Sequence, residues 1–154
     1  MNKITSSMIS ICRYQSKLFE YSVTKNASSL LFIKKFVFSD IAYRMGSIAF
    51  LFESVDFPAA FDEATEKKVI KKGVIYSEKT MAWIGYMYRY ICFLYNKPIT
   101  VVYRHIKPQE FYNVYDAYHS MDPELAAKRI LEAKNINFDK KIDLDLLKKI
   151  YNFD

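Results

Sequence analysis

Residues 77–96, SEKTMAWIGYMYRYICFLYN, decide the fold, because they form one helix that is apolar almost all round. With 3.6 residues per turn, one face carries Met81, Ile84, Gly85, Tyr88, Ile91, Cys92 and Tyr95, and the opposite face carries Trp83, Met87, Tyr90 and Leu94. A helix with two apolar faces is either the central helix of a bundle or a helix with one face kept for a partner. This choice is the main functional question that the sequence raises.

Capping residues and apolar spacing predict further helices on both sides of this segment. Before the central segment, the predicted helices are 5–24, one capped by Ser28 or Ser29, one from Ser39-Asp40 to a left-handed Gly46, and one from Asp56 to about Lys68. After it, the predicted helices are one capped by Thr100, one that begins at Pro108, one that begins at Asp122-Pro123-Glu124, and a last one capped by Asp143. Residues 47–55 are ambiguous between strand and helix. The sequence therefore predicts an all-α, multi-helix bundle around the aromatic helix at about 77–96.

Length and composition favour one domain. The chain has 154 residues, of which 51% are hydrophobic and 26% charged, with only 3 Gly and 4 Pro. These values are typical of a globular helical protein, so we expect residues 1–154 to form a single helical domain. Residues 71–76 have the weakest pattern and leave open a subdivision into N-terminal helices, 1–70, and an aromatic helical subdomain, 77–154.

The distribution of charge and cysteine bears on location and partners. The net charge of +6 could reflect an acidic partner or a nucleic acid, but acidic residues nearby largely balance the densest run of lysines. No apolar stretch reaches about 18 residues, since Arg89 interrupts the longest one, and no signal peptide opens the chain. Cys12 and Cys92 lie on apolar helical faces, where a disulfide is not expected. We therefore expect a cytoplasmic protein that does not enter a membrane.

No catalytic or ligand-binding motif is complete. His105 and His119 have no Cys, His or acidic residue at the spacing of a helical metal site. The three glycines are isolated, so no Gly-rich loop can hold a phosphate. The sequence thus predicts no catalytic residue, no metal and no cofactor, and a protein that is not an enzyme.

Arg89 stands out within the apolar helix, because an unpaired guanidinium is costly to bury. It must reach solvent, stack on an aromatic ring, meet an acid, or contact a partner. Interfaces favour Trp, Tyr and Arg, and these types occur at Trp83, Tyr86, Arg89 and Tyr90. We take these four residues as the candidate partner-binding site, and internal pairing of Arg89 as the alternative.

Three short boxes resemble a family of small uncharacterised Firmicutes proteins. The boxes are FIKKFVFSDIAYRM at 32–45, AWIGYMYRY at 82–90 and YHSMDP at 118–123. Ala82 departs from the pattern, which often has an aromatic residue there. Such proteins resemble the antitoxin-type partners encoded in toxin–antitoxin or phage-defence operons.

The resemblance implies a non-enzymatic protein-binding module, an antitoxin that neutralises a cognate toxin from a neighbouring gene by occluding its active site. The alternative is a nucleic-acid-binding regulator with a helix-turn-helix-like segment at about 84–106, although the helix after the turn offers few side chains to read bases. Nucleic acid is therefore not the favoured partner, and homo-oligomerisation stays open.

Overall fold

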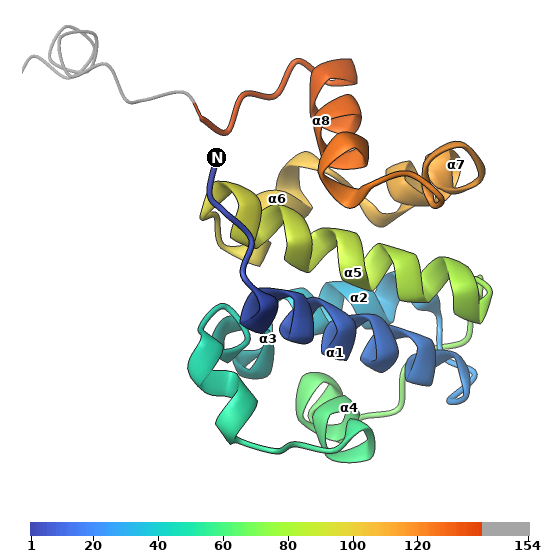
Figure 1. The fold of residues 1–154 in the computed structure, drawn as a ribbon. Coiled ribbons are helices and arrows are strands. Elements are labelled where there is room, and N and C mark those ends of the chain that lie inside the picture. Colours follow the sequence, from blue (N-terminus) through green and yellow to red (C-terminus); the bar gives the residue numbers. More distant parts are fainter. Residues whose placement is uncertain (140–154) are drawn as a thin grey trace, which may run out of the picture.

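α5 (Glu78–Tyr95) lies at the centre of the fold, between α1–α4 on one side and α6–α8 on the other (Figure 1). The computed structural model describes residues 1–139 and contains only helices and their connections in that range, so the predicted all-α class is confirmed. The remaining elements are α1 (Ser6–Val23), α2 (Ser29–Val37), α3 (Asp40–Arg44), the 3-10 helix η1 (Ile48–Phe52), α4 (Phe57–Thr65), α6 (Ile99–His105), α7 (Pro108–Tyr118) and α8 (Pro123–Ala133). The helix expected after Asp143 lies outside the described residues.

The ends of α5 follow from its sequence. The Ser77 hydroxyl accepts a hydrogen bond from the Thr80 N–H at 3.2 Å, which satisfies one of the free donors of the first turn. Asn96 ends the helix in the left-handed conformation, with φ at 51°, which Asn tolerates better than most residues. Between these ends both apolar faces are covered by other helices, so α5 is the central helix of the bundle.

The closest helix packing is between α1 and α5, which run antiparallel (Figure 1). Gly85 makes this approach feasible, because a Cβ there would lie 2.7 Å from Cγ of Phe19 and 2.9 Å from the carbonyl oxygen of Gln15. The Gln15 side chain also donates a hydrogen bond from Nε2 to the Gly85 carbonyl at 2.8 Å. A residue without a side chain is therefore required where the two longest helices cross.

Two predicted helix boundaries were wrong. α4 ends at Thr65 rather than near Lys68, because Glu66 and Lys67 both adopt left-handed φ angles of 56° and 57°. α6 begins at Ile99 and has Pro98, not Thr100, as its cap residue. Proline has no side-chain acceptor, so α6 begins without the side-chain capping hydrogen bond that the sequence suggested.

The region after α3 also differs from expectation. Gly46 does not have a positive φ, and α3 ends at Met45 in the right-handed conformation. The ambiguous residues 47–55 contain η1, which Ser47 caps by accepting a hydrogen bond from the Ala49 N–H at 3.3 Å. A short 3-10 turn is common where a chain connects two helices without room for a third.

The connection between α4 and α5 has no regular structure but is attached to α2. The Ser28 N–H donates to the Lys71 carbonyl at 3.2 Å, and the Ser29 N–H donates to the Val74 carbonyl at 3.0 Å. The Ser29 hydroxyl accepts from the Tyr76 N–H at 2.9 Å. The subdivision into 1–70 and 77–154 stays a prediction. None of the described helices is both long enough and apolar enough to cross a bilayer.

Replacing Gly85 with Ala is expected to lower the free energy of unfolding, although Ala favours an isolated helix by about 1 kcal/mol. The added methyl group would overlap α1, and overpacking of this kind costs about 1–3 kcal/mol. Urea unfolding followed by circular dichroism measures the change. Asn113→Ala, on the exposed side of α7, is the control, and it should be neutral or stabilising. A Gly85→Ala variant more stable than the parent would contradict the close approach of α1 and α5.

Candidate binding cavity around Arg89

Arg89 projects from α5 into the interior, where only 2% of the residue is exposed. Its Nε donates to Oε1 of Gln15 at 2.8 Å, and its Nη2 donates to the carbonyl oxygen of Ala42 at 3.0 Å. The Ala42 carbonyl belongs to the last turn of α3, where carbonyls have no helical partner. Both acceptors are neutral, and none of the residues in the described range forms an ion pair with Arg89.

The second terminal nitrogen, Nη1, has no hydrogen-bond partner among residues 1–139. In the same range, every fully buried side-chain nitrogen or oxygen has a partner. Nη1 must therefore reach the surface of a cavity that Arg89 lines. Burial lowers the pKa of the guanidinium, since a charge without a counterion is poorly solvated there. Arginine nevertheless keeps its proton in proteins, so the cavity has a positive charge at its floor.

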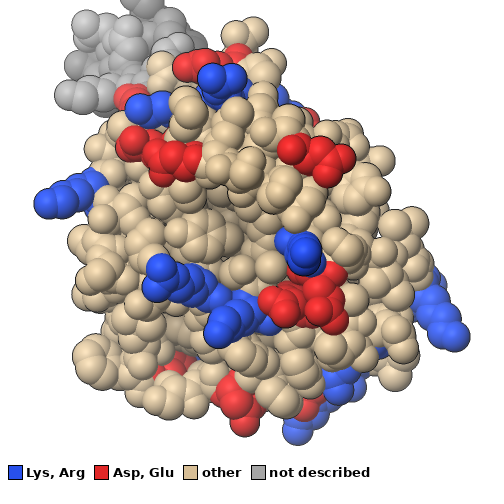
Figure 2. Space-filling model, turned by 45° about the vertical axis from the view of Figure 1, so that its right-hand side comes forward, with Lys and Arg blue, Asp and Glu red and all other residues tan. Residues whose placement is uncertain are grey.

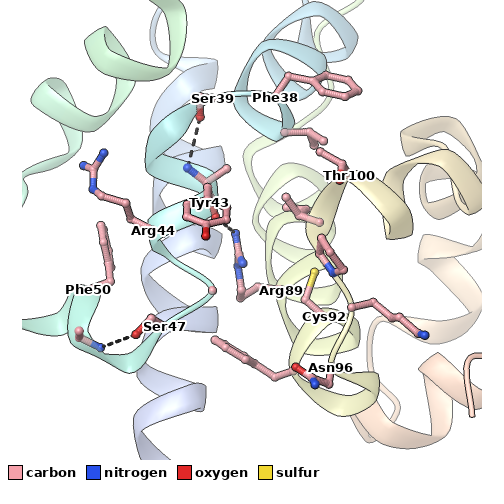
Figure 3. A pocket seen from close by; sticks show the side chains of 18 of the residues that line it. Phe38, Ser39, Tyr43, Arg44, Ser47, Phe50, Arg89, Cys92, Asn96 and Thr100 are labelled. Atoms are coloured by element: carbon pink, nitrogen blue, oxygen red, sulfur yellow. Dashed lines mark hydrogen bonds between the residues drawn. The ribbon is translucent and has the colours of Figure 1, made fainter.

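The cavity has a volume of about 740 Å³. One wall extends from the end of α2 through α3 to η1, and the other from the second half of α5 to the start of α6. Figure 3 shows Arg89 directed from α5 toward α3, between Phe38 at one end of the cavity and Asn96 at the other. Ser47 and Thr100 add hydroxyl groups, and the remaining surface is mostly apolar. A volume of this size is typical of a small-molecule site.

Charged residues on the cavity wall differ in how they are neutralised. Arg44 pairs with Glu53 at 3.1 Å, with Glu63 at 2.9 Å and with Asp40. These carboxylates raise the pKa of Arg44 above its usual value and leave no positive charge unbalanced there. Arg89, in contrast, has only neutral partners in the described chain. Lys97 also lines the cavity and forms no ion pair in the described range, but it is partly exposed, so Arg89 carries the buried unbalanced charge.

Four large apolar side chains are exposed on the segments that form one wall of the cavity, from the end of α2 to η1, and we call them the rim cluster: Phe38, Tyr43, Ile48 and Phe52. Tyr43 is 81% exposed and Phe52 89% exposed. Phe38 and Tyr43 line the cavity itself, while Ile48 and Phe52 lie on η1, which forms part of its wall. Exposed apolar side chains thus lie on the same segments as residues that line the cavity.

The structure separates the four predicted partner-binding residues. Arg89 follows the alternative of internal pairing, because hydrogen bonds hold its guanidinium inside; Tyr90 is also buried. Trp83 is half-buried, with its ring edge-on to Phe111 at 5.8 Å between centroids, and Tyr86 is half-buried and stacked on Tyr90 at 6.0 Å. Of the set, Trp83 and Tyr86 keep accessible surface, and their partner-binding role stays a prediction.

Sequence reasoning missed Gln15, which holds Arg89. Gln15 is fully buried in α1 and lies on the same stripe as Ile11, Cys12, Leu18 and Phe19. A polar residue within an apolar stripe indicates a buried hydrogen-bond partner elsewhere in the chain. That signal was present in the sequence, but it does not specify which of the distant residues is the partner.

The two cysteines are free thiols inside the bundle, in agreement with the expectation that they form no disulfide. Burial raises the pKa of Cys12 to about 12 and that of Cys92 to about 11. Both thiols are therefore protonated at neutral pH and unsuited to nucleophilic attack. In residues 1–139, the side chains of His, Cys, Asp and Glu form no group of three that could hold a metal ion.

The alternative of nucleic-acid binding rests on α5, the turn after it and α6. In α6 the exposed side chains are Arg104 and His105, at its C-terminal end, whereas recognition helices contact bases mainly through their N-terminal residues. Figure 2 shows one face of the molecule, on which basic and acidic side chains lie in small groups on a mostly uncharged surface. That face lacks the continuous basic stripe typical of a nucleic-acid interface. The alternative stays a prediction.

Comparison with known proteins gave no match: neither a protein-family model, nor a curated protein, nor a solved structure is similar to the chain.

Replacing Gln15 with Leu is expected to destabilise the parent protein more than it destabilises an Arg89→Met variant. In the parent, the change removes the Gln15 oxygen that accepts a hydrogen bond from the charged Arg89, an interaction worth about 1.5–3 kcal/mol. The Arg89→Met variant has no guanidinium, so it cannot lose this interaction. Urea unfolding of both single variants and the double variant gives the coupling. Gln109→Leu, on the exposed side of α7, is the matched control. Additivity within about 0.5 kcal/mol would show that Gln15 does not stabilise the charge.

The thiols of Cys12 and Cys92 are expected not to react with a disulfide reagent at about pH 8 while the protein is folded, since only the thiolate attacks. Absorbance of the released thiolate follows the reaction. Both cysteines should react rapidly when guanidinium chloride unfolds the chain, which provides the control. Fast labelling of the folded protein would mean that this part of the core opens readily.

Proposed function

We propose that this protein is a non-enzymatic binding module that acts by covering the surface of another protein, with neutralisation of a toxin as its biological role. The observation that carries the proposal is the exposure of the rim cluster on the segments that form one wall of a cavity. Monomeric proteins rarely leave large apolar side chains together at the edge of a recess unless a ligand or partner contacts them. The partner would be the product of a neighbouring gene, as the resemblance of the three boxes implies.

The chemistry of the rim cluster supports a protein partner. Tyr43 and Phe52 offer large, rigid surfaces, and aromatic side chains that fill or surround a recess account for much of the binding energy in many interfaces. The recess can also receive an anchoring side chain from the partner, because its walls are mostly apolar. Arg44 adds no free charge to this surface, since three carboxylates neutralise it. Recognition by the rim cluster would therefore depend chiefly on burial of apolar area.

Two of the three boxes meet at this surface although they are far apart in the sequence. The box at 32–45 contains Phe38 and Tyr43, and the box at 82–90 contains Arg89. The box at 118–123 follows α7 and does not line the cavity. A binding role for the cavity mouth would explain the exposed aromatic residues of the first box and the buried arginine of the second. Trp83 and Tyr86 on α5 are the competing surface for the same function.

Replacing Tyr43 or Phe52 with Ala is expected to weaken partner binding by about 2 kcal/mol or more, while the free energy of unfolding changes by under about 0.5 kcal/mol. Both side chains are highly exposed, so folding depends little on them. The measurement is co-expression with the neighbouring gene product, followed by pull-down and a growth-rescue assay.

Val69→Ala is the control for loss of exposed apolar surface away from the rim cluster, because Val69 is 97% exposed on the connection before α5. Tyr86→Ala tests the competing surface on α5. If Tyr86→Ala abolishes binding and rescue while Tyr43→Ala and Phe52→Ala retain both, the partner contacts the α5 surface instead. If no neighbouring product binds the parent protein, the proposal of toxin neutralisation fails.

A further inference from the structure

Arg89 is a buried cation that the described part of the protein leaves without an anion. A guanidinium has five N–H donors, and the two acceptors in the structure, Gln15 and the Ala42 carbonyl, use one at Nε and one at Nη2. Burying a charge without a counterion is costly. The same chain shows the usual solution at Arg44, where three carboxylates surround a far more accessible guanidinium. The missing negative charge at Arg89 is therefore a specific feature of the cavity.

The geometry leaves room for that charge. Nη1 lies 3.9 Å from the position that a Cβ would occupy at Gly46, and both residues line the cavity. Because Gly46 has no side chain, an anion can approach Nη1 from the cavity side. The Ser47 hydroxyl accepts from the Ala49 N–H, which leaves its own hydrogen free to donate. Nη1 has two N–H groups and no acceptor among residues 1–139, so an oxyanion in this corner would meet two donors.

The rest of the cavity fits an apolar group. Phe93 lies beside the guanidinium, with Cζ of Arg89 6.0 Å from the ring centroid, and Phe50 and Ile99 supply further buried apolar surface. A metal cation would be repelled by Arg89, and a bare inorganic anion would fill only a small part of about 740 Å³. The lining therefore suits a molecule that combines one anionic group with an apolar body.

We propose that the cavity binds a small organic anion, in which a carboxylate or phosphate bonds to Nη1 of Arg89 and an apolar or aromatic body packs against Phe50 and Phe93. The two headgroups share the chemistry that a guanidinium recognises, and both form strong charge-assisted hydrogen bonds. This site lies inside the cavity and does not require a protein partner. An experiment can therefore disprove anion binding without disproving the proposed function, and the reverse also holds.

The test is an NMR titration of the full chain with benzoate, phenyl phosphate and the neutral benzamide. Benzoate or phenyl phosphate should shift the backbone amide signals of Gly46, Ser47 and Thr100 saturably, with a Kd in the range of about 1 mM that is usual for so small a probe. Benzamide, which has nearly the same shape as benzoate, should bind at least about tenfold more weakly because it lacks the charge. Comparing the two anions identifies the preferred headgroup.

Arg89→Met should reduce anion affinity at least about tenfold, and Arg104→Met, the same change at an exposed arginine of α6 outside the cavity, should leave it unchanged. If Arg89→Met does not fold, the comparison of benzoate with benzamide on the parent protein decides alone. Equal binding of benzamide, signal changes confined to other parts of the protein, unchanged affinity in a folded Arg89→Met variant, or the absence of saturable shifts with either anion up to about 10 mM would each overturn the proposal.

Discussion

The side-chain amide of Gln15 joins the two constraints on which the rest of this structure depends. Its Nε2 donates to the Gly85 carbonyl where α1 and α5 approach most closely, and its Oε1 accepts from Arg89 one turn further along α5. The same residue therefore fixes the position of the central helix and the direction of its one buried charge. A different helix separation would remove both interactions, because a single side chain cannot span a wider gap.

The opposite wall of the cavity depends on packing rather than on the stability of its own elements. α3 and η1 are too short to be stable alone, since most helical stability at this length comes from tertiary contacts. Ile41 and Met45 are fully buried and anchor α3, and Phe50 anchors η1. The carboxylates around Arg44 connect α3, η1 and α4 at the surface, where each exposed pair adds little. Burial of these apolar anchors therefore sets the distance between the Ala42 carbonyl and Arg89.

Local signals made most of the fold predictable from the sequence. Ser39, Asp56 and Ser77 were identified as starts of helices, and Ser28 was one of two alternatives, because a cap needs only the backbone of the next turn. The apolar faces of α5 likewise predicted a central helix as one of two alternatives.

The features that the sequence did not predict depend on contacts between residues far apart in the chain. Internal pairing of Arg89 was one of two alternatives, but the sequence did not identify its acceptors, because they come from α1 and α3 and neutral acceptors leave no pattern of opposite charges to recognise. The cavity was unpredictable for a similar reason, since its two walls are separated by more than thirty residues of sequence. The exposure of Phe38 in the rim cluster was not predictable either, because FIKKFVFS has the spacing of a buried helix. α2 ends at Val37, and this end leaves Phe38 outside the core.

The hydrogen bonds of Arg89 determine how the floor and the rim of the cavity can work together. Turning the guanidinium toward the mouth would break two buried bonds, and bonds to charged groups contribute about 1.5–3 kcal/mol each. Arg89 therefore acts as a fixed charge that an anion must enter the cavity to meet, whereas a protein lying across the mouth meets exposed side chains such as Tyr43 first. Under the two proposals, the charge of Arg89 determines which molecule binds inside the cavity, and the apolar area of the rim cluster determines which protein covers it. The two kinds of recognition can then vary independently, because no residue of the rim cluster forms a hydrogen bond with Arg89.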